Sequence, residues 1–106
     1  MPTLAIAVLK YVEMGDELVQ YINRIDETLL PFGGRFLVHG ETAELLEGNW
    51  NSDLVIIQFP DREHARGWYT SDAYQAILKL RTRNSDGDAF LIDTVADGHR
   101  ATDILL

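Results

Sequence analysis

The 106-residue chain contains no cysteine, which excludes disulfide bonds, thiol catalysis, thiolate metal ligands and iron–sulfur clusters. It has only three prolines and eight glycines, too few for a collagen-like or low-complexity chain. No apolar run approaches the roughly 20 residues that a membrane-spanning helix needs. The start of the chain lacks the charged segment and cleavage site of a signal peptide, so we expect a cytoplasmic protein.

Basic residues are scarce as well. Nine Lys and Arg stand against 17 Asp and Glu, which gives a net charge of −8. Nucleic-acid binding needs a basic surface, so neither a nucleic acid nor an anionic membrane is an expected partner. His39, His64 and His99 are the only histidines, and no two of them have metal-ligand spacing. Gly33-Gly34 lacks the residues that complete a phosphate-binding loop, so we expect neither a metal nor a cofactor.

The chain does have enough apolar residues for one core, at 46% of the sequence. A chain of this length typically forms a single domain. We assign residues 1–96 to that domain and residues 97–106 to a C-terminal tail. The tail ends in Ile-Leu-Leu, and we expect it to pack on the domain or on a partner subunit.

Short runs rich in β-branched residues predict four strands. These strands cover residues 3–12, 35–40, 53–59 and 88–95. Gly40 predicts a bulge or a bend, after which residues 43–47 are expected to continue the pairing. Asp97-Gly98 predicts a turn into the tail.

Two helical regions are predicted between the strands. The first has an N-cap at Asp16 and ends at Pro31. Its apolar face consists of Leu18, Ile22, Ile25 and Leu29, which recur at helical spacing. The second begins at the N-cap Asp61 and is interrupted at Thr70-Ser71, where Ser71 caps a further helical segment.

This element order, strand–helix–strand–strand–helix–strand, is the ferredoxin-like βαββαβ arrangement of the α+β class. It predicts a four-stranded antiparallel sheet with two helical regions on one face. The first and third strands have the longest apolar runs and should be central. Their apolar residues supply both faces, so the face without helices would leave a large apolar patch. We therefore expect a homodimer in which two sheets pack face to face.

Four motifs in order carry a resemblance to a known family. They are Gly33-Gly34-Arg35, Leu46-Glu47-Gly48-x-Trp50, Phe59-Pro60 and Trp68-Tyr69-x-Ser71-x-x-Tyr74. Together they resemble the bacterial family called domain of unknown function 1330, over about residues 3–96. The resemblance implies a ferredoxin-like chain that pairs as a dimeric α+β barrel, with no established activity. Where the family usually has Arg at the end of the second strand, this chain has His39, which differs in charge and reach.

Six residues are candidates for a ligand site: His39 for acid–base catalysis, Arg35 as a carboxylate anchor, and Trp50, Trp68, Tyr69 and Tyr74 as substrate-binding walls. Strict alternation places Arg35 and His39 on one face of their strand, roughly 13 Å apart. The competing interpretation makes the three clustered aromatics core residues and makes Arg35 and His39 an edge-strand pair. Trp50 either covers the end of the core or closes a pocket or dimer seam.

Three functions fit these observations. The first is a homodimer that binds a small organic molecule between sheet and helices, and that by fold analogy could be a cofactor-free enzyme of oxygenase or isomerase type. The second is a non-catalytic ligand-binding module with the same pocket. The third is a structural dimer with a filled interior. A cavity between the sheet and the helices would support the first two functions, and a filled interior would support the third.

Overall fold

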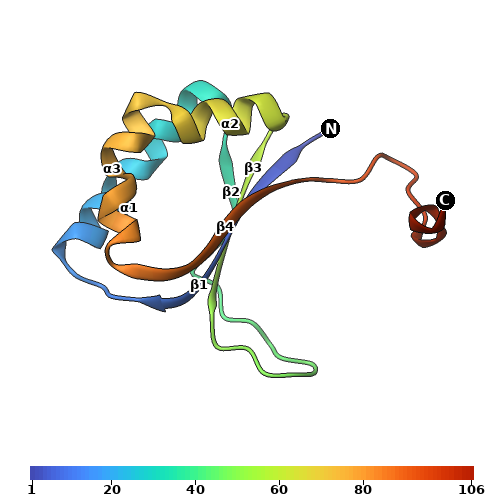
Figure 1. Cartoon of the computed structure of the whole chain (residues 1–106), viewed down its shortest axis with the longest axis horizontal. Coiled ribbons are helices and arrows are strands. Elements are labelled where there is room, and N and C mark those ends of the chain that lie inside the picture. Colours follow the sequence, from blue (N-terminus) through green and yellow to red (C-terminus); the bar gives the residue numbers. More distant parts are fainter.

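The computed structural model describes residues 1–106. Figure 1 shows a strongly twisted sheet with all three α-helices on one face. The elements are β1 (Thr3–Val12), α1 (Asp16–Leu29), η1 (Leu30–Phe32), β2 (Arg35–His39), β3 (Asp53–Phe59), α2 (Arg62–Thr70), α3 (Asp72–Thr82), β4 (Ser85–Asp93) and η2 (Ala101–Leu105). The sheet order is β2-β3-β1-β4 with every neighbouring pair antiparallel. This is the predicted ferredoxin-like fold, with the first and third strands in the centre.

Side-chain caps divide the second helical region into α2 and α3, as predicted. The Asp61 carboxylate accepts a hydrogen bond from the His64 N–H at 2.8 Å, and Ser71 Oγ accepts one from the Tyr74 N–H at 3.2 Å. The predicted cap at Asp16 is wrong, because Gly15 occupies the N-cap position without a side-chain bond. Asp16 instead lies in the first turn of α1, where its negative charge favours the helix N-terminus.

The exit from α1 is formed by a proline and a glycine. Pro31 lies in the single 3₁₀ turn that follows the helix, and Gly33 adopts a left-handed backbone with φ of 68°. A residue with a Cβ atom is strained in this conformation, so glycine is favoured there. The turn directs the chain into β2.

Two predicted strand segments differ from the structure. Residues 43–47 form no strand, because the chain turns at Gly40 with φ of 81° and runs as an exposed loop to residue 52. Figure 1 shows this loop projecting away from the sheet. β4 begins at Ser85 and ends at Asp93, rather than spanning 88–95. Its polar start is tolerated because an edge strand exposes much of its surface to water.

The register divides the sheet residues between two faces. Residues directly opposite each other in an antiparallel pair share a face. The face under the helices carries Thr3, Ala5, Ala7 and Leu9 of β1 with their partners Phe59, Ile57, Val55 and Asp53 of β3. The open face carries Leu4, Ile6 and Val8 with Gln58, Ile56 and Leu54. The main core lies on the helix side, so the apolar open face has no cover within the chain.

The tail continues from β4 away from the sheet and the helices and ends in η2 (Figure 1). Its last residues, Ile104, Leu105 and Leu106, are exposed. The tail does not fold back on its own domain here, and its packing on a partner subunit stays a prediction. No helix of the chain has both the length and the apolar character required to cross a membrane.

Candidate functional site

A cavity of about 540 Å³ lies between the helices and the inner face of the sheet. Hydrophobic residues make up 19 of the 26 residues that line it, and its size is within the usual range for small-molecule sites. Its floor is made partly of alanines, because Ala5 and Ala7 of β1 and Ala89 of β4 all line the cavity. Larger side chains at these central positions would fill the space. The alternating Ala5-x-Ala7 pattern was therefore a sequence signal for a cavity.

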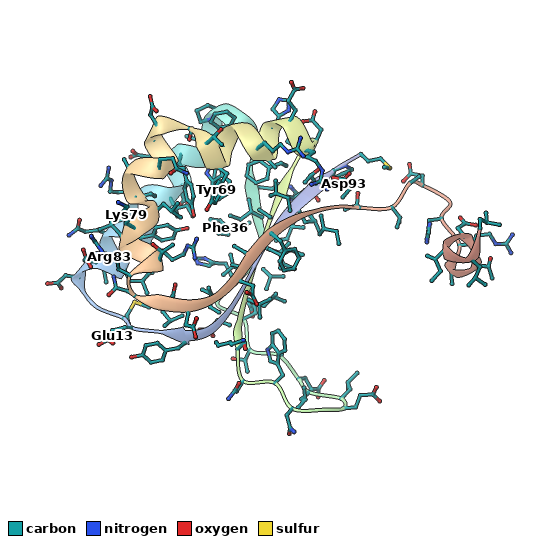
Figure 2. The ribbon with its side chains drawn as sticks, in the orientation of Figure 1. Glu13, Phe36, Tyr69, Lys79, Arg83 and Asp93 are labelled. Atoms are coloured by element: carbon teal, nitrogen blue, oxygen red, sulfur yellow. The ribbon has the colours of Figure 1, made fainter.

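The predicted aromatic cluster forms one wall of this cavity. Trp68 and Tyr74 are buried, with ring centres 4.1 Å apart. Tyr69 is 40% exposed, and its ring centre lies 5.6 Å from that of Tyr74. In Figure 2, Tyr69 of α2 and Phe36 of β2 lie on the same side of the sheet, in the region between helices and strands. The aromatic residues therefore contribute both to the core and to the cavity wall.

A β-bulge at Leu37 decides which β2 side chains reach the cavity. Phe36 pairs with Ile57 whereas Val38 pairs with Ile56, so Leu37 is an extra residue in β2. The bulge places Phe36 and His39 on the helix side, where their rings stack at 4.5 Å. The prediction that Arg35 and His39 share a face is wrong, because strict alternation does not hold across a bulge.

Arg35 and Trp50 lie outside the cavity. Arg35 is exposed and pairs with Gln58 on the open face. Trp50 belongs to the projecting loop, is 44% exposed and lines a separate groove of about 420 Å³ with Val38 and Leu54. Both of those partners belong to the open face. The structure thus brings His39, Trp68, Tyr69 and Tyr74 together at the cavity and separates Arg35 and Trp50 from them.

Three cavity residues are absent from the sequence-based candidates: Tyr21 of α1, Arg66 of α2 and Arg81 of α3. Tyr21 is buried, and its hydroxyl oxygen lies 2.9 Å from that of Tyr74. Burial raises the pKa of Tyr21, with a further contribution from Tyr74, so the phenol is neutral at ordinary pH. The guanidinium carbon of Arg81 lies 5.9 Å from the centre of the Tyr21 ring.

The remaining two histidines lie away from the cavity. His64 is exposed, and its Nδ1 lies 2.6 Å from the Asp61 carboxylate. His99 lies in the exposed tail, 3.6 Å from the Asp103 carboxylate. The chain contains no group of three or more His, Cys, Asp or Glu residues arranged to hold a metal ion.

Solved structures with the same fold cover nearly the whole chain. The RPA0582 protein of unknown function from Rhodopseudomonas palustris is 16% identical, with a TM-score of 0.66 over 90% of this chain and 83% of that chain. SnoaB, a cofactor-independent oxygenase from Streptomyces nogalater, is 13% identical, with a TM-score of 0.63 over 93% and 98%. A dimeric ferredoxin-like protein of unknown function from Thermobifida fusca is 14% identical, with a TM-score of 0.59 over 89% and 92%. At these identities the likeness establishes the fold alone.

A comparison with curated proteins finds no match. The family described as "Domain of unknown function (DUF1330)" matches residues 2–95, which is most of the chain. The match covers every strand and α-helix of the structure and stops just after β4. This chain therefore belongs to the DUF1330 family, as its four ordered motifs predicted.

Proposed function

We propose that this protein is a homodimer in which each chain binds a small, largely apolar organic molecule between its sheet and its helices. The cavity of about 540 Å³ is the observation that carries the proposal. A purely structural module would cover or fill this space, because apolar surface left open to water costs stability. Instead, alanines keep the floor open, and a few polar groups, among them His39, converge on an apolar space, as in small-molecule sites.

The homodimer is supported by the composition of the open face. Its central residues Ile6 and Ile56 lie opposite each other, and Ile92 of β4 is 49% exposed there. A contiguous apolar face of this kind marks an interaction surface in a soluble protein. A second copy of the chain offers the same apolar surface, and two of the structurally similar proteins are described as dimeric. Sheet-to-sheet pairing would also leave the cavity on the helix side of each chain unobstructed.

We assign His39 the role of proton donor and acceptor toward the bound molecule. Its ring is held against Phe36 on the cavity side, and imidazole transfers protons near neutral pH. The structurally similar SnoaB is described as a cofactor-independent oxygenase, so this fold supports chemistry without a cofactor. The reaction class that fits is abstraction of an acidic proton from the ligand. The alternative, a binding module without catalysis, predicts ligand binding that does not respond to substitution of His39.

The cavity can be tested with a neutral probe, 1-naphthamide, while the ring resonances of the three histidines are followed by NMR. We expect saturable shifts for His39, whereas His64 and His99 serve as internal controls outside the cavity. The variant Ala7→Leu should weaken binding by filling the cavity floor, and Ala76→Leu on the exposed side of α3 should not. Absence of saturable binding, or equal shifts at all three histidines, would contradict the proposal.

A further inference from the structure

The charged side chains of the cavity lining are mostly basic, whereas those of the whole chain are mostly acidic. The whole chain carries −8, yet the lining contains two arginines, Arg66 and Arg81, against a single acidic residue, Asp53. Two of nine basic residues therefore line the cavity but only one of 17 acidic residues does. Asp53 and Arg66 are both exposed, whereas Arg81 is half-buried. The cation that is most shielded from water in this lining is Arg81.

Arg81 has no carboxylate partner in the protein. The four ion pairs of the chain join Arg62 to Asp93, His64 to Asp61, Arg83 to Glu17 and His99 to Asp103. Burial acts to lower the pKa of Arg81, but the Tyr74 and Tyr21 oxygens beside it act in the opposite direction, and the net change is upward. The guanidinium therefore stays positive. A partly desolvated cation without an anion is costly, so this position favours an anionic ligand.

One hydroxyl proton of the two tyrosines beside Arg81 makes no hydrogen bond within the protein. Tyr21 and Tyr74 are both buried, and their oxygens share one hydrogen bond of 2.9 Å. Each phenol carries one proton, and whichever oxygen donates, the shared bond uses only one of the two protons. Neither hydroxyl donates to any other group of the protein. The remaining O–H is thus available to an acceptor atom in the cavity, next to the guanidinium.

We propose that Arg81, Tyr21 and Tyr74 bind the carboxylate of a monocarboxylic acid with an aromatic body, and that this body occupies the apolar remainder of the cavity. The N–H fork of arginine matches the two oxygens of a carboxylate, and the free tyrosine O–H adds a third donor. The rings of Phe36, Trp68 and Tyr69 line the same cavity and favour contact with an aromatic ligand. This inference rests on the proposed function, since it names the ligand class of the same cavity.

Calorimetric titration of the intact protein with 1-naphthoate and with its neutral analogue 1-naphthamide tests the inference. We expect the naphthoate to bind at least about tenfold more tightly, since charge-assisted hydrogen bonds carry this discrimination. Arg81→Met should remove the preference. Lys79→Met removes the same charge from an exposed position on the same helix and should keep the preference. The double variant Tyr21→Phe and Tyr74→Phe removes both hydroxyls, and with them the free O–H donor, so it should weaken naphthoate binding several-fold.

The outcomes separate the two proposals. Equal binding of both probes to the unaltered protein, or an undiminished preference in Arg81→Met, would overturn the carboxylate site and leave the cavity intact. Binding of neither probe would overturn the proposed function together with this inference. If Arg81→Met does not fold, Arg81→Lys replaces it, because lysine keeps the charge but lacks the fork. Arg81→Lys should then show a reduced preference, and an unchanged preference would overturn the site.

Discussion

Thr28 links the aromatic cluster to the backbone of α1. The buried indole N–H of Trp68 donates to Thr28 Oγ1 at 2.9 Å, and the Thr28 hydroxyl donates in turn to the Ile25 carbonyl at 2.6 Å. Trp68 also packs against Phe59, with ring centres 5.3 Å apart. The Thr28 hydroxyl is therefore the hydrogen-bond partner of the buried Trp68 indole N–H. It also fixes the orientation of an aromatic ring that lines the cavity.

The variant Thr28→Val should lower the free energy of unfolding by about 1–3 kcal/mol, because the indole N–H would be buried without a partner. Valine has nearly the same shape as threonine, so packing changes little. Thr82→Val, at the exposed end of α3, is the matched control and should change stability by less than about 0.5 kcal/mol. Urea unfolding measures both values. Equal stability of Thr28→Val and the unaltered protein would show that the indole finds another partner.

Residue-level prediction of the site succeeded where neighbours along the chain carry the signal. Trp68, Tyr69 and Tyr74 are close in sequence and were predicted to cluster, as the structure shows. Tyr21 was missed although it lies three residues after Leu18 on the same helical face. Arg81 was not predictable, because a cation near a helix C-terminus normally faces water. The orientation of His39 depends on a bulge set by pairing with β3, which is a non-local effect.

At the scale of elements, the β1–β4 pair contains a second irregularity. Leu9 pairs with Gly87 and Tyr11 pairs with Asp86, so Lys10 is an extra residue in β1. Gly87 lies tightly against the partner strand, and an added Cβ atom would overlap the carbonyl oxygen of Val8. The overlapping atoms belong to the backbone of β1, so no side-chain rotation can relieve the overlap. The close approach of β1 and β4 therefore requires glycine at this position.

Gly87→Ala should lower the free energy of unfolding by more than about 2 kcal/mol, since the substitution forces the two strands apart. Gly15→Ala is the control, because no atom lies within 4 Å of its added Cβ. That change removes only the preference for glycine at an N-cap and should cost less than about 1 kcal/mol. Thermal or urea unfolding of the two variants measures the difference. Similar stability of both variants would contradict the tight β1–β4 contact.

Two carboxylates, Glu17 and Asp93, each bind a residue that is distant in the sequence. The Asn84 side-chain amide lowers the pKa of Glu17, assisted by the Arg83 guanidinium at 2.6 Å. The Thr3 hydroxyl, which donates at 2.7 Å, lowers the pKa of Asp93. A carboxyl whose pKa is lower in the folded chain stabilises the fold when it is ionised. This stabilisation is complete above the unfolded pKa, near pH 4, and is lost as pH falls through the lowered folded pKa.

We therefore expect the free energy of unfolding to fall as the pH is lowered from 6 to 3. Glu17→Gln should make this fall shallower, because it removes one of the carboxyls that takes up a proton on unfolding. Glu27→Gln on the exposed side of the same helix is the control and should leave the slope unchanged. Urea unfolding at several pH values gives the slopes. An identical slope for Glu17→Gln and the unaltered protein would show that this contact does not contribute.

Element boundaries were predictable where apolar runs or side-chain caps define them. The predicted strands 3–12 and 53–59 match β1 and β3, and the caps at Asp61 and Ser71 are confirmed. The ends of β4 were not predictable, because its polar residues are strand only through their pairing with β1. The loop after Gly40 was misassigned for a related reason. Residues 43–47 contain three apolar residues, but no neighbouring strand pairs with them.

At the scale of the whole molecule, the proposed homodimer depends on the open sheet face. Ile56→Glu places a charge at the centre of this face, and burying it between two sheets would be strongly unfavourable. We expect this variant to be monomeric at micromolar concentration. Ile92→Glu, at an already exposed position of the face, should weaken the dimer as well and tests the same surface if Ile56→Glu does not fold.

The control for this surface is Val19→Glu, which adds the same charge to an exposed position of α1 on the other side of the molecule. It should leave the assembly dimeric. Sedimentation velocity distinguishes the species. A dimer in Ile92→Glu and Ile56→Glu that is as stable as in the control would place the interface elsewhere.

The proposed assembly is a pair of chains, joined through their sheets, that each keep an open cavity. Native mass spectrometry at neutral pH with added 1-naphthoate tests both parts in one measurement. We predict the mass of two 12.0-kDa chains, increased by one probe molecule per chain as the probe concentration rises. The mass of a single chain, or a dimer that takes up no probe, would rule out this assembly.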